Sequence, residues 1–270
     1  MILKEILAQF EWDLHLDQSN LLTQVIAGFI VPGMGSTGFQ KSAQLLGIGI
    51  YSIAEASKYI KVPSTKLSRW VKGHGGGNRA YDRLWRPQIE LEDGTVYVGF
   101  RDLVQSRFAQ ALIDEGLSPQ KVRLAIQRAG EIMNHDHPFA ASRLQTDGRT
   151  IFLNVFTDAA SNDDVKQQRL IDLLRNEQFV MKRIVEPSLR GIEFEDDWAA
   201  RWWPFGRSFG VVLDPLRQFG EPIDYESGIP VSVLSAAVRA DGSVKAAARA
   251  LVVPIRAVTR AVSFEQKLAA

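Results

Sequence analysis

The sequence predicts a mainly α-helical protein with small β elements. Segments whose apolar residues recur at helical spacing, several of them preceded by a helix-capping residue, occur in both the N-terminal and the C-terminal part of the chain. An alternating apolar pattern around Asp93-Gly94 predicts a β-hairpin between them. In chain order we expect an extension over residues 1–49, a winged helix-turn-helix domain over 50–155, a mixed α+β middle of linker helix and short strands over 156–209, and a trihelical, helix-turn-helix-like domain over 210–270.

The composition limits the kind of protein this is. The chain has 270 residues, is 46% hydrophobic and contains no cysteine. This suffices for a substantial core and for two or three modest domains. The lack of cysteine excludes a disulfide scaffold and thiolate metal sites, and it is consistent with a reducing cytoplasm, where we place the protein.

The first 49 residues carry no recognisable motif. Their apolar run, residues 21–32, is too short to span a bilayer and contains Thr23, Gln24 and Gly28. Acidic residues precede the run, whereas a secretory signal has a basic segment there. We therefore expect a soluble protein without a membrane segment. Whether the native protein begins at Met1 or at Met34 stays open.

The net charge of +1 conceals an asymmetry along the chain. Residues 51–90 have a net charge of +5, residues 131–230 of −6 and residues 231–270 of +4. An anionic partner for the two basic segments would explain this separation, and so would a solvated helix surface with no partner.

The stretch YSIAEASKYIKVPSTKLSRWV, residues 51–71, predicts two short helices joined by a turn. Ser52 and Glu55 form a capping-box pattern at the start of the first helix, which the sequence Lys61-Val62-Pro63 ends. We expect Ser64 to cap the second helix. The positions expected in the core are Ile53, Ala56 and Ile60 on the first helix and Leu67, Trp70 and Val71 on the second.

A β-hairpin is predicted over RPQIELEDGTVYV, residues 86–98, because apolar residues alternate on both sides of Asp93-Gly94. The glycine-rich residues 73–77 before it are expected to be a flexible loop. They lack the Gly-Lys-Ser/Thr of a nucleotide-binding loop. Two helices followed by a hairpin make a winged helix, in which the second helix enters the DNA major groove. Arg83 and Arg86, at the start of the wing, suit phosphate contacts.

Two longer helices are expected next, over residues 100–115 and from Ser118-Pro119 onward. From YSIAEASKYIKVPSTKLSRW to FRDLVQSRFAQALIDEGLSPQKVRLAI the layout resembles MerR-type winged helices. The continuation HPFAASRLQTDGRTIFL is similar to the DNA-binding part of VapB-type antitoxins of type II toxin–antitoxin operons. This resemblance covers roughly residues 50–155.

The middle of the chain predicts one long amphipathic helix over 164–186 and short strands over 192–203 and 209–213. Turns are expected at Asp196-Asp197 and at 204–206. The tryptophans in this region could form a stacking platform, but we expect a core or interface role for them. These tryptophans are Trp198, Trp202 and Trp203.

Three helices are predicted near the C-terminus, over about 231–240, after the cap Ser243, and after Val253-Pro254. The third should turn Ile255, Val258 and Val262 inward. The sequence FGEPIDYESGIPVSVL…GSVKAAARALVVPIRAVTRAVSFE resembles a small trihelical family that recurs in antitoxins. The resemblance implies that one part of such a protein binds its own promoter and another part masks a PIN-domain ribonuclease.

No enzyme is expected, because the chain contains no nucleophile elbow, metalloprotease motif or dinucleotide fingerprint. His135-Asp136-His137 offers too few ligands for a tetrahedral metal site, so we assign it a loop or core role. We predict no catalytic residue, no metal and no cofactor.

The preferred interpretation is a homodimeric antitoxin that represses its own operon and neutralises a cognate PIN-type toxin. The alternatives are a stand-alone MerR-like regulator that senses a small molecule, and a structural interaction protein without a DNA role. The residues expected to bind operator DNA are Ser64, Thr65, Lys66, Ser68, Arg69, Lys72, Arg83 and Arg86. The candidates for toxin binding are Arg249, Arg256 and Arg260.

Overall fold

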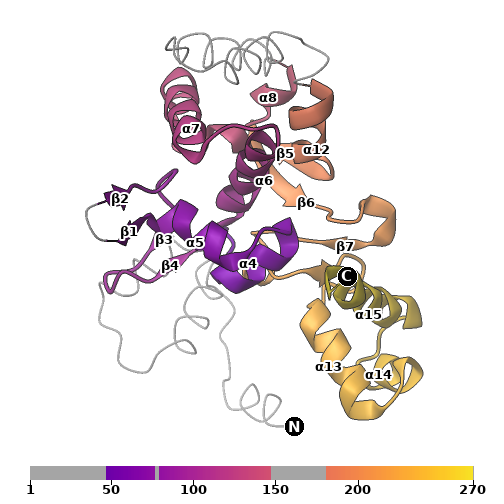
Figure 1. Cartoon of the computed structure of the whole chain (residues 1–270). Coiled ribbons are helices and arrows are strands. Elements are labelled where there is room, and N and C mark those ends of the chain that lie inside the picture. Colours follow the sequence, from indigo (N-terminus) through magenta and orange to yellow (C-terminus); the bar gives the residue numbers. More distant parts are fainter. Residues whose placement is uncertain (1–46, 77–78, 147–180, 270) are drawn as a thin grey trace, which may run out of the picture. The chain divides into compact units, whose positions relative to one another are not determined.

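The computed structural model describes residues 47–76, 79–146 and 181–269 (Figure 1). These residues all belong to one unit of the chain, 47–270. The predicted extension up to residue 46, the DGR segment of the antitoxin resemblance and the predicted helix up to residue 180 lie outside them. Within the described residues the chain is mainly helical with small antiparallel sheets, as the sequence predicts. None of the helices described is long and apolar enough to cross a membrane.

Helical elements occur in all three described ranges. The α-helices are α4 (Ile53–Ile60), α5 (Ser64–Lys72), α6 (Phe100–Asp114), α7 (Pro119–Met133), α8 (Arg143–Thr146), α12 (Glu186–Leu189), α13 (Val231–Asp241), α14 (Val244–Ala250) and α15 (Ile255–Ala269). A π-helical turn, η2 (Met181–Val185), precedes α12, and the 3₁₀ turns are η1 (Pro138–Ala140), η3 (Arg207–Phe209) and η4 (Gln218–Gly220). β-hairpins lie between α5 and α6 and between α12 and α13.

The strands form two-stranded antiparallel sheets within the described ranges. Their pairs are β1 (His74–Gly76) with β2 (Arg79–Tyr81), β3 (Ile89–Glu90) with β4 (Val96–Tyr97), β5 (Ile192–Glu195) with β6 (Trp198–Trp202), and β7 (Val211–Val212) with β8 (Ile223–Asp224). The expected hairpin around Asp93-Gly94 is therefore confirmed as β3–β4, and the expected turn at Asp196-Asp197 as β5–β6.

The start of α4 forms as predicted. The Ser52 hydroxyl accepts a hydrogen bond from the Glu55 backbone N–H, and the Glu55 carboxylate accepts one from the Ser52 backbone N–H. The cap expected at Ser64 is wrong. Pro63 occupies the N-cap of α5 and Ser64 is already its first helical residue. The extended conformation of Pro63 starts the helix without a side-chain hydrogen bond.

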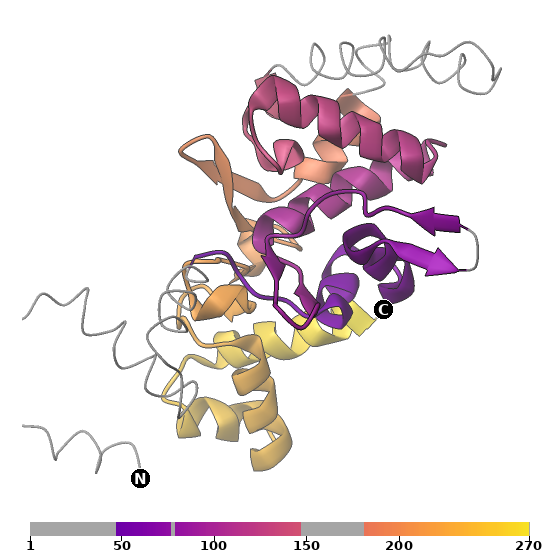
Figure 2. The ribbon, with the colours of Figure 1, turned by 90° about the vertical axis from the view of Figure 1, so that its left-hand side faces the viewer.

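The flexible loop expected at residues 73–77 is also wrong in part. His74–Gly76 pairs with Arg79–Tyr81 as an additional hairpin, β1–β2, directly after α5. Glycine has no side chain, so the apolar alternation that reveals a strand is missing from this sequence. Figures 1 and 2 both show this hairpin projecting beyond the end of α5. The assignment of the whole arrangement as a winged helix stays a prediction.

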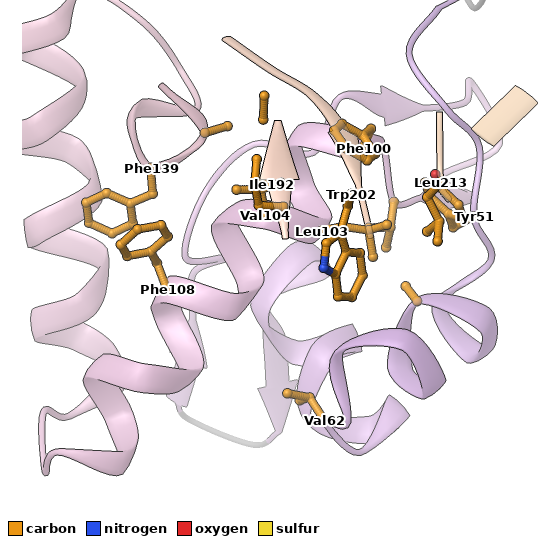
Figure 3. Close-up of a cluster of buried hydrophobic side chains, with 14 of the residues drawn as sticks. Tyr51, Val62, Phe100, Leu103, Val104, Phe108, Phe139, Ile192, Trp202 and Leu213 are labelled. Atoms are coloured by element: carbon orange, nitrogen blue, oxygen red, sulfur yellow. The ribbon is translucent and has the colours of Figure 1, made fainter. Parts of the chain in front are cut away.

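Helix α6 lies in the core and is buried around most of its circumference. Its apolar residues contact elements from both halves of the described chain, and the Phe108 and Phe139 rings lie 5.3 Å apart (Figure 3). The buried residues of α6 are Phe100, Asp102, Leu103, Val104, Gln105, Ser106, Phe108, Ala109 and Leu112. The same apolar cluster extends from Tyr51 to Phe264.

A buried carboxylate, Asp102, joins several segments at the start of α6. Its Oδ1 accepts a hydrogen bond from the Trp85 indole N–H at 2.8 Å and lies 2.7 Å from Nε2 of His137. Its Oδ2 accepts the backbone N–H groups of Gln88 and Gly99 at 2.9 and 2.8 Å. The carboxylate therefore fixes α6 to the segment before β3 and to the segment before η1, and its bond to Gly99 caps the start of α6 itself.

The structure of the middle and C-terminal elements differs from the sequence prediction at several positions. The strand expected over 209–213 is shorter in the structure, because Phe209 belongs to η3 and β7 covers only Val211–Val212. Its partner strand β8 lies in a region that the sequence pattern assigns to a loop. Trp202 and Trp203 are buried, which confirms their core role, and Trp198 is half-buried. The expected inward position of Ile255 is wrong, since its side chain is 51% exposed. Helix α15 instead packs through Ala257, Val258, Ala261 and Phe264.

We expect Asp102→Asn to destabilise the fold by about 2–4 kcal/mol, because one oxygen becomes an amide nitrogen that faces N–H donors in a buried site. Urea unfolding followed by tryptophan fluorescence measures the change. Asp114→Asn, at the exposed end of the same helix, should change stability by less than about 0.5 kcal/mol. Equal stability of the two variants would contradict the role of Asp102.

Candidate nucleic-acid interface

Helix α5 has one buried face and one exposed face. Leu67, Trp70 and Val71 are buried, as predicted. Thr65 and Arg69 on the other side of the helix are exposed. The exposed set also contains Ser64 and Lys72, whereas Ser68 is half-buried. The structure therefore brings most of the predicted helix residues to one exposed face.

Lys66 differs from its neighbours because its side chain is engaged within the chain. Its Nζ donates a hydrogen bond to Oε1 of Gln110 on α6 at 2.9 Å and lies 5.3 Å from the centre of the Trp70 ring. This contact holds α5 against α6. This hydrogen bond uses one of the three N–H donors of the Lys66 ammonium group, so its position is set by Gln110 while other donors remain.

The turn between α4 and α5 is held by local hydrogen bonds. Lys61 caps α4 in the left-handed conformation, with φ of 55°. The Ser57 hydroxyl donates to the Val62 carbonyl at 2.6 Å, and the Val62 side chain is buried. The position of α5 relative to α4 is therefore set by packing and hydrogen bonding at the turn.

The β1–β2 hairpin adds an aromatic pair beside α5. The His74 and Tyr81 rings stack with centres 4.6 Å apart and planes 9° apart. Gly73 connects α5 to this hairpin with φ of 74°, and a Cβ atom there would lie 2.7 Å from the Tyr81 carbonyl oxygen. Only glycine fits this approach without a shift of the backbone.

The two arginines expected at the start of the wing lie between β2 and β3. Arg83 forms an ion pair with Glu90 at 2.9 Å and its side chain is 38% exposed. Arg86 is exposed and forms no ion pair within the described residues. Of the two, Arg86 has the guanidinium group that an outside phosphate can reach without breaking an ion pair.

An open groove of about 1380 Å³ runs between this region and α7. Three of the predicted DNA-binding residues, Lys72, Arg83 and Arg86, line it together with His74 and Arg123. Asp82, Glu131 and Asp136 also line it, and Asp82 forms an ion pair with Arg123 at 2.8 Å. The groove thus has mixed charge. Sequence reasoning missed His74 and Tyr81 because the short β1–β2 hairpin has no alternating pattern. It missed Arg123 because the packing of α7 beside this hairpin is a tertiary feature.

The residues of the His135-Asp136-His137 segment have structural contacts. His137 is buried against Asp102, and its backbone N–H donates to Nδ1 of His135 at 2.9 Å. The His135 ring lies 3.9 Å from the Trp198 ring. Burial and the neighbouring Arg101 guanidinium lower the pKa of His135, which favours its neutral form. Within the described ranges no cluster of three or more His, Asp or Glu side chains suits a metal ion.

The three candidates for toxin binding differ in their contacts. Arg256 and Arg260 both donate to the Glu226 carboxylate, and Arg260 also donates to the buried Asp224 at 3.0 Å. Hydrogen bonds from Arg256 and then from Arg260 lower the pKa of the Glu226 carboxyl. Arg249, at the end of α14, is exposed and forms no ion pair in the part of the chain that the structure describes.

Comparison with known proteins finds similarity to a curated protein and to a solved structure. The chain is 28% identical over 229 residues to the protein named "Putative antitoxin VapB45" of Mycobacterium tuberculosis, which covers 78% of this chain and 91% of that protein. The crystal structure of Rv2018 from Mycobacterium tuberculosis superposes with a TM-score of 0.61 at 24% identity, covering 80% of this chain and 99% of that one. This second likeness concerns the fold alone. No protein-family model matches the chain. Over most of its length the chain is therefore similar to a protein that carries the name of a VapB antitoxin.

Proposed function

We propose that this chain is a DNA-binding antitoxin of the VapB type, which represses its own operon and neutralises a cognate PIN-domain ribonuclease in the cytoplasm. The similarity to VapB45 is the observation that carries the proposal. The exposed polar face of α5 and the basic C-terminal helices supply the two binding surfaces that such a protein needs.

The proposed DNA interface centres on α5 as the second helix of a helix-turn-helix unit. Its first turn and exposed face would enter the major groove, where an arginine can grip guanine through two hydrogen bonds. Arg69 is the candidate for that contact, and Thr65 can reach a base or the backbone. Lys72 and Arg86 are placed for phosphate contacts, which provide affinity without sequence preference.

The proposed assembly is a homodimer. One short helix reads only a short site, and two-fold pairing doubles the contact and matches a palindromic operator. The amphipathic helix predicted over residues 164–186 is a candidate dimer interface, because its apolar stripe needs a cover. It lies mostly outside the described residues. At its described end, Ile184 is buried within the chain's own core.

The proposed toxin-binding surface is the C-terminal helical unit. PIN-type toxins hold metal ions with carboxylates, so a basic side chain from the antitoxin can compete for that cluster. Of the three candidate arginines, Arg249 can do so without giving up an ion pair, whereas Arg256 and Arg260 hold Glu226 and Asp224. We therefore favour Arg249 over the other two.

A second candidate function is a MerR-like regulator that senses a small molecule. The groove beside α7 favours it, because the groove adjoins the proposed DNA-binding helix at Lys72. The neighbouring gene separates the two proposals. A gene for a PIN-type nuclease beside this one supports the antitoxin, and its absence supports the stand-alone regulator.

We expect Arg69→Ala to weaken binding to the operon's own promoter by about 1–3 kcal/mol and to relax specificity at one base position. Fluorescence anisotropy with promoter variants measures both effects. The melting temperature should stay unchanged, because the side chain is exposed. Arg190→Ala, another exposed arginine far along the chain, should bind DNA like the unmodified protein. Unchanged affinity and selectivity of Arg69→Ala would remove α5 from the interface.

We expect Arg249→Glu to weaken capture of the neighbouring nuclease by tenfold or more, about 1.4 kcal/mol, because the reversed charge is repelled by the carboxylate cluster. Co-purification and biolayer interferometry test this, with Arg190→Glu as the control. DNA binding by the Arg249 variant should be unaffected. If capture is intact, the middle of the chain becomes the candidate toxin-binding surface.

A further inference from the structure

The turn between α14 and α15 contains a backbone conformation that its sequence does not favour. Val252 has φ of 55°, in the left-handed region, and its side chain is 89% exposed. The Val252 backbone N–H donates to the Arg249 carbonyl and the Val253 N–H to the Ala248 carbonyl. These two hydrogen bonds form a Schellman motif, in which the left-handed position usually holds glycine.

Valine is a costly residue at this position. A β-branched side chain in the left-handed region strains the backbone, because its Cβ substituents crowd the neighbouring peptide groups. The exposed side chain recovers almost none of this by packing within the described residues. The corresponding residue after α13 is Gly242, with φ of 74°. Glycine adopts this left-handed conformation without strain. The hydrogen bonds of the Val252 turn need no side chain at all.

The surroundings of Val252 indicate the chemistry of a partner. Ile255, three residues on at the first turn of α15, is 51% exposed. Arg249 precedes the turn and is exposed, whereas Arg256, which follows the turn, is ion-paired with Glu226. Arg249 is therefore the cation beside the apolar pair that is available to a partner. The residues from 231 to 270 have a net charge of +4. An apolar pair beside a cation complements an apolar hollow beside carboxylates.

We propose that Val252 and Ile255 form the apolar anchor of the toxin-binding surface, with Arg249 directed at the acidic cluster beside the hollow that receives them. This inference rests on the proposed antitoxin function. It adds the specific contact that gives the complex its stability. The anchor explains why a strained, solvent-exposed valine occupies a glycine position.

The Val252→Gly variant tests whether Val252 anchors the toxin or supports the fold, because the two roles predict different changes in melting temperature and in toxin affinity. We expect the variant to melt at a higher temperature, since the strain is relieved, and to bind the purified nuclease encoded beside this gene with a Kd raised tenfold or more. Val252→Asn, which tolerates the left-handed conformation but is polar, should show the same loss of binding. Leu124→Ala, on an exposed part of α7 and outside the C-terminal helical unit, is the matched control and should bind normally.

Other combinations overturn the proposal. An unchanged Kd for Val252→Gly shows that the valine is not an anchor, even if capture still depends on Arg249. A lower melting temperature shows that the valine side chain supports the fold. If the unmodified full chain does not bind the nuclease, the antitoxin function itself fails and the anchor fails with it. Promoter binding by the Val252 variants, measured in parallel, should equal that of the unmodified chain.

Discussion

The buried carboxylate of Asp102 is the constraint on which the N-terminal half of the described structure depends. A carboxylate without access to water is tolerated only when its oxygens are hydrogen-bonded. Here Trp85, Gln88, Gly99 and His137 meet that requirement, and they come from three stretches of the chain: the β2–β3 connection, the residue before α6 and the segment before η1. Each donor is useful only if its segment is in place. The carboxylate therefore makes the packing of β3, β4, α6 and η1 interdependent.

This interdependence matters for the proposed interface because α5 packs on the same scaffold. Lys66 bonds to Gln110 of α6, and the Trp70 and Trp85 rings lie 6.3 Å apart. Trp85 is itself a donor to Asp102. The buried face of α5 is thus held by the network that fixes α6. A recognition helix supported in this way presents its exposed side chains without a large loss of conformational entropy on binding.

Local signals in the sequence predicted local structure well. The capping box at Ser52 and the Asp93-Gly94 turn are formed by residues close together in the chain, so their patterns are complete within a short window. The features that were not predicted are those that tertiary contacts determine. The sequence does not reveal that Asp102 is buried, that Gly-rich residues pair as β1–β2, or that β8 completes β7. Exposed residues of α5 were predictable, but the pairing of Arg83 with Glu90 and of Arg260 with Asp224 was not.

The two proposed binding surfaces are connected through the core. The Tyr51 hydroxyl, just before α4, donates a buried hydrogen bond to the Gly220 carbonyl at 2.8 Å, and α15 contacts α4. Coupling between DNA and toxin binding requires two arrangements of an element that both ligands contact or move. The turn at Val252 and the exposed face of α5 both lie away from this connection, on surfaces of the same packed unit. The α4–α15 contact and the Tyr51–Gly220 hydrogen bond are two contacts through which coupling between the surfaces could act. Breaking this buried hydrogen bond would cost free energy, so we expect the two proposed surfaces to bind their ligands largely independently within one chain.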